Sequence, residues 1–167
     1  MKRLALMRHA KSSWKDPALE DFDRPLNKRG RENAPLMGRR LARFGFQPQL
    51  ILASPALRAR QTAELVAAEL SGSRREVVYE PRLYQQQPTT LLEVIKDIDE
   101  GIQDVLLIGH NPELTELVNF LSTRKFDQLA TGGVACLIFQ IESWQRIQPN
   151  SGDILFESYP KKPFPFP

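Results

Sequence analysis

Short apolar runs alternate along this chain with stretches in which apolar residues recur every three or four positions. The runs predict strands at residues 4–7, 50–53, 76–79, 105–108, 134–141 and 154–159. The stretches between them predict amphipathic helices, one with an apolar face of Ala34, Met37, Leu41 and Phe44, and another with Ala63, Val66, Ala67 and Leu70. This alternation predicts an α/β layer fold with a mostly parallel sheet.

Capping residues indicate where the helices begin. Asn27 is the expected N-cap of the first helix, but Pro35 lies inside the apolar pattern and predicts either a kink or a later start. Ser54-Pro55 and Asn111-Pro112 each follow a predicted strand, and each pair suits an N-cap followed by proline at the first helical position. Two further helices are therefore expected to begin at strand ends.

The length and composition suit one domain. The 167 residues are 41% hydrophobic, enough for one ordinary core, and we expect a single domain over residues 1–160. The proline-rich tail, residues 161–167, cannot extend a helix or central strand and is expected to form a strap or a frayed end. The apolar run at the start is too short for a signal peptide or membrane span, so we expect a cytoplasmic protein without membrane contact.

Charge and cysteine content narrow the functional classes. The chain has 23 Lys and Arg and 20 Asp and Glu, and they are interspersed, so the net charge of +3 comes with no long basic run. Aromatic residues do not interleave with basic ones, which argues against a nucleic-acid partner. Cys136 is the one cysteine and lies in an apolar run, so burial is expected rather than catalysis. An anionic small molecule or protein remains a suitable partner.

The chain has two histidines, and both follow a strand-like run. His9 ends the run LALMRH, and His110 ends DVLLIGH. Ligands of open α/β sheets bind outside the carboxyl ends of the strands, so both rings are expected in the same crevice. Arg58 follows the strand at 50–53 by about one helical turn and can turn its guanidinium back over that strand end, whereas Arg43 and Arg60 are read as surface charges. With Asn111 at the start of a helix, these residues predict an anion site.

Several motifs together carry a family resemblance. LMRHA, SPALRARQTAEL and LLIGHNPEL resemble, in that order, the histidine phosphatase superfamily, and RHAKSSW, DFDRPLNKRG and RLY resemble its short SixA-type phosphohistidine phosphatase branch. The resemblance implies a phosphoglycerate mutase-like fold, a three-layer α/β/α sandwich. It implies that His9 is the phosphate-accepting nucleophile, that Arg8, Arg58 and His110 form the phosphate pocket, and that Arg24 is a further phosphate-binding residue. For Arg24 the alternative is a salt bridge to Asp21 or Asp23.

Two positions depart from the family pattern. The superfamily commonly has glycine after the nucleophile, and this chain has Ala10, which predicts a turn with negative φ. Many members supply a carboxylic general acid from a segment resembling RLYQQQP, where this chain has Tyr84 and Gln85. We therefore expect no strong general acid. Separately, Asn111 is expected to assist phosphate binding.

These features predict a metal-independent phosphatase with no cofactor. Arginine forks match phosphate oxygens, and a neutral His9 attacks in line to give a phosphohistidine intermediate. His110, if it is protonated, holds the transferring group. The expected substrate is phosphohistidine on a protein, and the alternative is a phosphomonoesterase or mutase acting on small phosphorylated metabolites. A metal-dependent hydrolase is disfavoured because arginines beside both histidines would repel a cation, and a non-catalytic phosphoprotein-binding module would not need His9.

Overall fold

The computed structural model describes residues 1–72 and 75–165. In this part of the chain the strands are β1 (Lys2–Arg8), β2 (Leu50–Ala53), β3 (Glu76–Tyr79), β4 (Asp104–Gly109), β5 (Val134–Phe139) and β6 (Asp153–Ser158). All six predicted strands are confirmed, with ends that differ by at most two residues. The apolar runs are clearest in β1, β2, β4 and β5, which are almost wholly buried, as strands covered on both faces must be.

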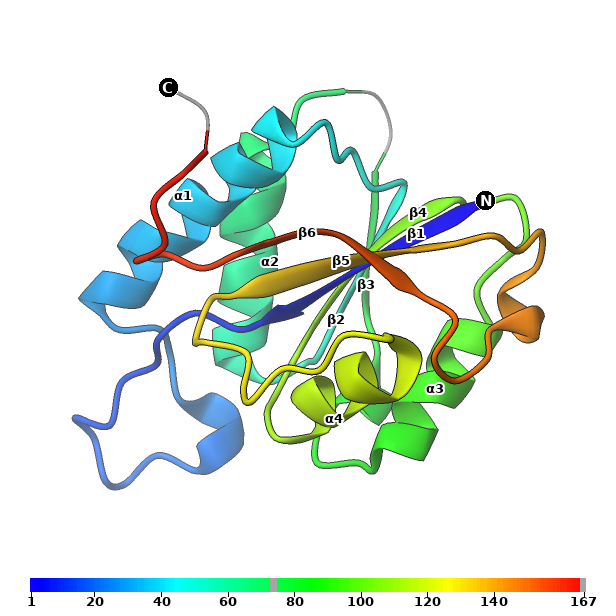
Figure 1. Cartoon of the computed structure of the whole chain (residues 1–167). Helices are drawn as coiled ribbons and strands as arrows, with labels where there is room; N and C mark the ends of the chain where they lie inside the picture. The colour runs from blue at the N-terminus through cyan, green and yellow to red at the C-terminus, as the bar shows by residue number, and fades with distance from the viewer. Residues whose placement is uncertain (73–74, 166–167) are drawn as a thin grey trace.

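The six strands form one sheet in the order β3-β2-β4-β1-β5-β6 (Figure 1). β1 pairs in parallel with β4, β4 with β2, and β2 with β3, whereas β5 runs antiparallel to both of its neighbours, β1 and β6. The expectation of a mostly parallel sheet is therefore confirmed. The two central strands, β4 and β1, carry the two histidines just beyond their carboxyl ends.

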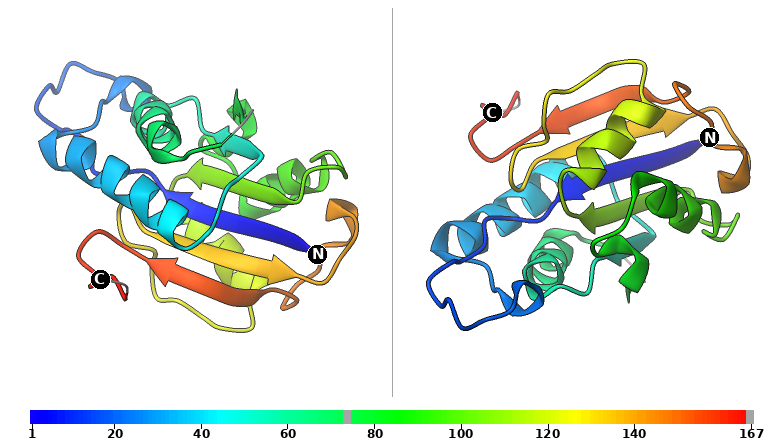
Figure 2. Two further views of the ribbon diagram at one scale, coloured as in Figure 1. Left: turned by 90° about the horizontal axis from the view of Figure 1, so that it is seen from above. Right: turned by 90° about the horizontal axis from the view of Figure 1, so that it is seen from below.

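Helices cover both faces of the sheet and give three layers. They are α1 (Lys28–Arg43), α2 (Leu57–Glu69), α3 (Pro88–Lys96) and α4 (Glu113–Leu121). The two views of Figure 2 show α1 and α2 on one face and α3 and α4 on the other. β1 leads into α1 and the adjacent β4 leads into α4, so the chain leaves these neighbouring strands toward opposite faces. Such a switch point is where α/β sheets bind ligands.

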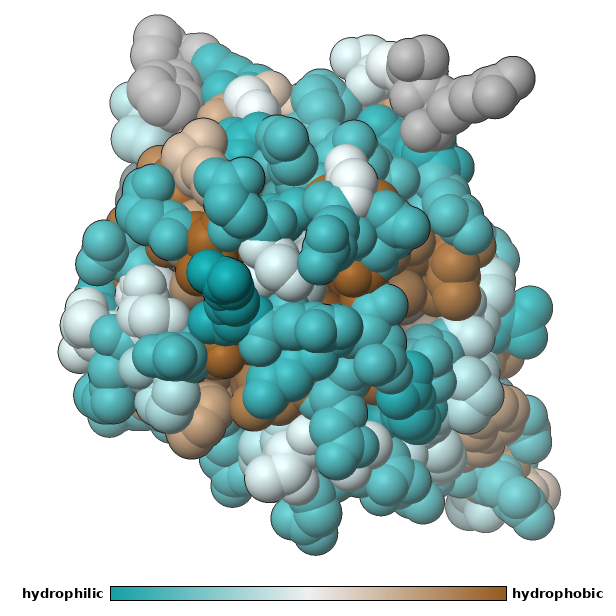
Figure 3. Space-filling view, turned by 90° about the vertical axis from the view of Figure 1, so that its right-hand side faces the viewer, coloured by the Kyte–Doolittle hydropathy of each residue, from teal (hydrophilic) through white to brown (hydrophobic). Residues whose placement is uncertain are grey.

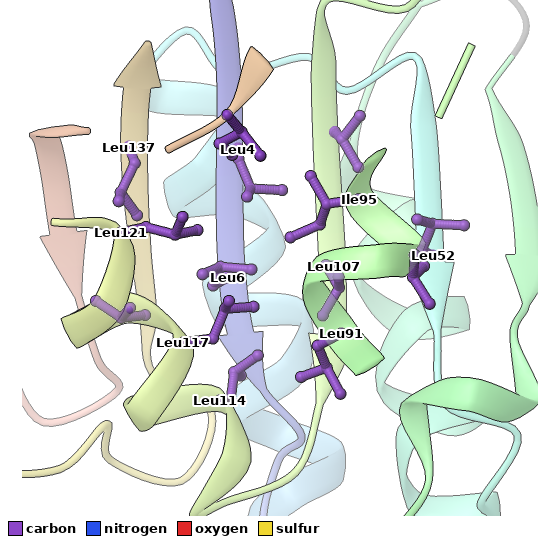
Figure 4. Close-up of a cluster of buried hydrophobic side chains, with 14 of the residues drawn as sticks. Leu4, Leu6, Leu52, Leu91, Ile95, Leu107, Leu114, Leu117, Leu121 and Leu137 are labelled. Atoms are coloured by element: carbon purple, nitrogen blue, oxygen red, sulfur yellow. The ribbon is translucent and has the colours of Figure 1, made fainter. Parts of the chain in front are cut away.

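Two hydrophobic clusters hold the layers together. One packs α1 and α2 onto the sheet and is centred on buried Met7, Met37, Ile51 and Phe46. The other packs α3 and α4 onto the opposite face, and Figure 4 shows its leucine and isoleucine side chains gathered between strands and helices, among them Leu4, Leu6, Leu91, Ile95, Leu107, Leu114, Leu117 and Leu121. Alternate residues of β1 thus enter opposite clusters, as the period of a strand requires.

The expected N-cap is found at α1 but not at α2. α1 begins at Lys28, where Asn27 Oδ1 accepts a 2.8 Å hydrogen bond from the Gly30 N–H, and continues through Pro35, so the later start is wrong. α2 begins at Leu57, so Ser54 is not its N-cap. The Ser54 hydroxyl is instead hydrogen-bonded to the Ala56 N–H and to His110 Nε2.

The start of α4 also lies one residue later than predicted. Pro112 occupies the N-cap position, Glu113 is the first helical residue, and Asn111 is therefore not the N-cap. Asn111 Oδ1 nevertheless accepts a 3.2 Å hydrogen bond from the Thr115 N–H, so its side chain still satisfies a free amide of the first turn. The expectation that this helix starts beside a strand end is confirmed.

The described part of the tail lies along α1. The ring of Phe164 meets the edge of Phe44 at 5.1 Å, and Arg40 of α1 donates a 2.6 Å hydrogen bond to the Tyr159 carbonyl just before the tail. The tail up to residue 165 thus packs as a strap, and residues 166–167 of the predicted tail lie outside the described residues. Cys136 is buried in β5, and burial raises the pKa of its thiol to about 12.

Figure 3 shows the face that carries the amino end of β1, where hydrophilic side chains predominate and hydrophobic patches are small and separate. Within the described residues, none of the helices is long and apolar enough to cross a membrane.

Candidate active site

The strand order brings the predicted site residues to one edge of the sheet. β4 lies between β1 and β2, so His110 after β4 is flanked by Arg8 and His9 at the end of β1 and by Ser54 after β2. The imidazole rings of His9 and His110 lie 5.1 Å apart between centroids. The expectation that both histidines share a crevice is confirmed.

The ring of His9 presents one nitrogen to the crevice. Its Nδ1 lies 2.7 Å from the carbonyl oxygen of Ala10, which can only accept, so Nδ1 carries the proton. Nε2 is therefore unprotonated, and its lone pair accepts a 3.3 Å hydrogen bond from Arg58 Nε–H. The pKa of His9 is lowered to about 4. Burial of the ring is the main cause, and the nearby positive charges of Arg58 and Arg8 contribute to the same shift. At neutral pH the ring is therefore uncharged.

The loop that carries His9 is fixed by its neighbours. The Ala10 N–H donates a 3.1 Å hydrogen bond to Thr62 Oγ1, which itself donates to the Arg58 carbonyl. Ala10 is absent from the described residues with positive φ, which confirms the ordinary turn expected there. Thr62 was not singled out in the sequence, although it lies one helical turn after Arg58 in the SPALRARQTAEL motif. Its hydroxyl ties the loop that carries His9 to the helix that carries Arg58.

His110 is also neutral in the free protein. Its Nε2 lies 2.7 Å from Ser54 Oγ and its Nδ1 lies 3.4 Å from Arg58 Nη2, a donor, so Nδ1 accepts and Nε2 carries the proton. Burial, the neighbouring His9 ring and the charge of Arg58 lower the pKa of His110 to about 3. The role expected of His110 if it is protonated therefore does not apply to the free protein, in which the ring is neutral. Its neutral ring orients the Arg58 guanidinium instead.

Arg58 lies at the centre of these contacts. It is the second residue of α2, only 5% of its surface is exposed, and its guanidinium reaches back over the strand end as predicted. Besides the two histidines it contacts Asp21, donating a 2.6 Å hydrogen bond from Nη1 to the backbone carbonyl and a 3.0 Å bond from Nη2 to Oδ2. All of its nitrogens are thus directed by neighbours, which holds the fork in a single orientation.

Arg8 enters the crevice from the end of β1. Its Nη1 donates a 3.0 Å hydrogen bond to the Leu129 carbonyl, while its Nε is buried without a hydrogen-bond partner. Burial lowers the pKa of this guanidinium from its ordinary value. A buried donor without an acceptor is costly, and an anion in the crevice would supply one.

Arg24 lines the crevice and is held there by neighbouring side chains. It is buried against the same crevice, where it ion-pairs with Asp21 at 3.2 Å and donates a 2.9 Å hydrogen bond to Ser12 Oγ. The ring of Trp14, itself 76% exposed, lies over the guanidinium at 3.5 Å. The salt bridge to Asp21 is confirmed, and Arg24 also lines the crevice. A contact with phosphate stays a prediction.

Asp21 is the functional residue whose position the sequence left undetermined. It opens a short 3₁₀ turn, Asp21–Asp23, and its carboxylate contacts both Arg24 and Arg58. Tyr84 Oη donates a 2.7 Å hydrogen bond to Oδ2 of the same carboxylate. Partial burial opposes ionisation, but the hydrogen bonds from Tyr84 and Arg58 outweigh it and lower the pKa of Asp21 to about 2. The sequence indicated a contact between Asp21 and Arg24, because both lie in the segment DFDRPL. No local pattern predicted the contact between Asp21 and Arg58.

Asn111 lines the crevice, but its side chain is turned into the protein. Oδ1 accepts from the Thr115 N–H and hydroxyl, and Nδ2 donates a 3.1 Å hydrogen bond to the Leu129 carbonyl. The same carbonyl accepts from Arg8, so Asn111 helps to hold the segment that positions Arg8. Its predicted contact with phosphate stays a prediction.

Together these residues line an open cavity of about 480 Å³. Three arginines and the carboxylate of Asp21 leave two positive charges around the histidines, which matches the charge of a phosphate dianion. Lys11 and Glu113 also line the cavity and offset one another in charge. Among the described residues no group of three or more His, Cys, Asp or Glu side chains could hold a metal ion. The donor set of guanidinium groups suits an anion rather than a cation.

Comparisons with known proteins agree with this geometry. An uncharacterized chloroplastic protein of Arabidopsis thaliana is 35% identical over 159 residues, which cover 90% of this chain and 72% of that protein. A crystal structure assigned to the phosphohistidine phosphatase SixA of Agrobacterium tumefaciens superposes with a TM-score of 0.82 at 28% identity, covering 95% of this chain and 98% of the other.

A protein histidine phosphatase SixA solved with tungstate shares the fold, with a TM-score of 0.79 at 24% identity over 95% of this chain and 97% of that one. Residues 4–88, which include His9, Arg24 and Arg58, match the sequence profile of the histidine phosphatase superfamily, branch 1. The expected fold, an α/β sandwich like that of the phosphoglycerate mutases, is confirmed. The chain belongs to branch 1 of the histidine phosphatase superfamily.

Proposed function

We propose that this protein is a metal-independent phosphatase that hydrolyses phosphohistidine on proteins through a phosphorylated His9. The observation that carries the proposal is the state of His9: a neutral ring, with the Nε2 lone pair directed into a cavity of arginines. Only an unprotonated nitrogen can attack phosphorus, and the surrounding cations attract the phosphate while they disfavour protonation of the ring. No cofactor is needed for this chemistry.

Each step uses a residue already at the cavity. His9 Nε2 attacks phosphorus in line and the bond to the leaving group breaks, while Arg8, Arg58 and Arg24 stabilise the charge on the three transferring oxygens. Arg8 has an unused buried donor for this purpose. Binding of the dianion raises the pKa of His110, so the ring takes up a proton from solvent and donates a hydrogen bond to a phosphate oxygen. Water hydrolyses the phosphorylated His9 in the second step and regenerates the ring.

The protonation state of the cavity favours a phosphoramidate over an alkyl ester. An alkoxide leaving group needs a general acid, worth about 10² to 10⁴ in rate, and Asp21 is held ionised with a pKa of about 2. Tyr84 and Gln85 line the cavity in the segment where the family resemblance led us to look for a carboxylic acid. A phosphohistidine leaves as an imidazole, whose other nitrogen is readily protonated near neutral pH. Such a substrate therefore depends little on a general acid from the protein.

The open cavity also suits a protein substrate. Trp14 lies at its margin with most of its surface exposed, so a macromolecule can approach the arginines without an enclosing lid. We further propose that residues 1–160 form one catalytic domain, that the tail braces α1, and that the protein acts in the cytoplasm. The competing function is a phosphomonoesterase that takes small phosphorylated metabolites.

Relative turnover tests the substrate class. We expect kcat/KM to rank a phosphohistidine protein first, aryl phosphates next, and phosphoserine or sugar phosphates last. A sugar phosphate turned over faster than the phosphohistidine protein would support the competing function.

Trapping of the intermediate tests the nucleophile separately. Acid-labile, alkali-stable phosphate should appear on the wild type in excess chelator and be absent from His9→Ala, with turnover lost in that variant. Label that survives the substitution, or turnover that a divalent ion restores after chelation, would defeat the mechanism.

A further inference from the structure

A second cavity adjoins the catalytic one. It measures about 210 Å³ and includes Lys11, Arg29, Asn33, Thr131, Tyr159 and Lys161 in its lining. Lys11 and Thr131 line both cavities, so the two share a wall. A chain that places a phosphorylated residue at His9 therefore passes beside this second cavity.

Its walls are built on the loop that carries the nucleophile. The Gly132 N–H donates a 3.0 Å hydrogen bond to the His9 carbonyl, and the Asn27 N–H donates a 2.9 Å bond to the Lys11 carbonyl. A Cβ at Gly30 would lie only 2.1 Å from that Lys11 oxygen, so glycine is required for α1 to pack this closely. The first turn of α1, which presents Arg29, is therefore fixed relative to His9.

The charges of this second cavity are unpaired. Throughout residues 1–72 and 75–165, the side chains of Lys11, Arg29 and Lys161 have no hydrogen-bond or ion-pair partner, and neither Asp nor Glu lines the cavity. This contrasts with Arg24 and Arg58, whose charges are met by Asp21. Three unneutralised cations around one hollow create a local positive potential that attracts an anion.

We propose that this cavity, the basic subsite, binds carboxylate side chains that flank the phosphohistidine in an acidic protein substrate. The inference rests on the proposed function. Successive residues of an extended chain are spaced by about 3.3 Å, so acidic residues within a few positions of the phosphohistidine can reach across the shared wall. Exposed lysines and one arginine suit exposed carboxylates, and Asn33 and Tyr159 provide further hydrogen-bonding groups.

Substitution of Arg29 and Lys161 tests the basic subsite. Lys11 is left unchanged because it also lines the catalytic cavity. Two synthetic peptides carry one phosphohistidine each, flanked by glutamates in one and by glutamines in the other. For Arg29→Gln with Lys161→Gln, we expect kcat/KM on the glutamate peptide to fall about three- to tenfold, as loss of two exposed ion pairs implies. Turnover of the glutamine peptide and of p-nitrophenyl phosphate should stay within about twofold, since surface charges act over short range.

A matched control removes the same net charge elsewhere. Lys96→Gln with Arg146→Gln changes two cations at the end of α3 and in the short turn Trp144–Arg146, at the opposite end of the sheet from His9. We expect this control to keep the wild-type preference for the glutamate peptide. A wild type without that preference, or equal losses in both double variants, would overturn the subsite, as would an equal loss on p-nitrophenyl phosphate.

Failure of the proposed function would look different. In that case the wild type would turn over neither phosphohistidine peptide, and the subsite is then tested by fluorescence anisotropy with a labelled, unphosphorylated glutamate peptide. Binding that weakens with Arg29→Gln and Lys161→Gln, but not with the control pair, would uphold the subsite. No binding, or binding that is indifferent to both pairs, would reject it.

Discussion

Tyr84 Oη donates a 2.7 Å hydrogen bond to the carboxylate of Asp21, across 63 residues of sequence. This contact, with the ion pair between Asp21 and Arg58 at 3.0 Å, keeps the carboxylate ionised among the arginines that line the cavity. The pair has two consequences. The cavity lacks a protonated acid at this position, and its arginines already hold an internal anion.

Gln85→Glu tests the first consequence. Gln85 lines the cavity, so a glutamic acid there can protonate a leaving alkoxide, and we expect kcat/KM on phosphoserine to rise about tenfold or more. p-Nitrophenyl phosphate, whose leaving group needs little protonation, should change by less than about twofold. Gln86→Glu is the matched control, because Gln86 is exposed and does not line the cavity. A similar gain on both substrates, or with both variants, would contradict the argument.

Asp21→Asn tests the second consequence. Loss of the carboxylate frees Arg24 and Arg58 to meet an oxyanion, and we expect tungstate to inhibit the variant at about tenfold lower concentration, since one nearby like charge is removed. Asp23→Asn in the same turn is the control, because Asp23 is exposed and makes no ion pair with either arginine. The measurement is the inhibition constant at fixed pH and ionic strength. Unchanged inhibition in Asp21→Asn would mean that the carboxylate does not compete with the oxyanion.

Arg58→Ala should lose about 10²-fold or more in kcat, the effect of removing one preorganised charge donor. Arg60→Ala is the control on the same helix, because Arg60 is exposed and its guanidinium lies over the ring of Tyr79, away from the histidines. We expect it to change kcat by less than about twofold. Thermal unfolding of both variants checks that the fold is kept. Equal activities in two folded variants would remove Arg58 from the reaction.

The pH dependence of kcat/KM reports the charge of His9 in the free enzyme. The pKa of His9 is lowered to about 4, and the nucleophile must be unprotonated, so activity is retained as pH falls from 7 to 5 and is lost as pH passes through about 4. An ordinary histidine would instead lose activity near pH 6.5. Rates corrected for substrate ionisation provide the measurement. An acidic limb centred near 6.5 would contradict the lowered pKa of His9.

The sequence by itself determined the elements and the principal residues of the site. Apolar runs located the six strands, most clearly β1, β2, β4 and β5, because strands covered on both faces must be apolar. Strand ends located His9 and His110 because parallel strands share a carboxyl edge. The short distance along α2 from the strand end then placed Arg58 over the same edge. Each inference used residues within about one turn or one strand of each other, where spacing alone fixes direction.

The tertiary structure decided which distant groups share that edge. Asp21 meets Tyr84 and Arg58 only because the 3₁₀ turn folds over the start of α2, and Ser54 bonds His110 rather than capping a helix because β4 lies beside β2. The basic subsite likewise joins Lys11 and Arg29 to Lys161, which is more than 100 residues away in the 167-residue chain. Such contacts depend on strand order and on loop packing, and these arise from the burial of the whole core rather than from any local pattern.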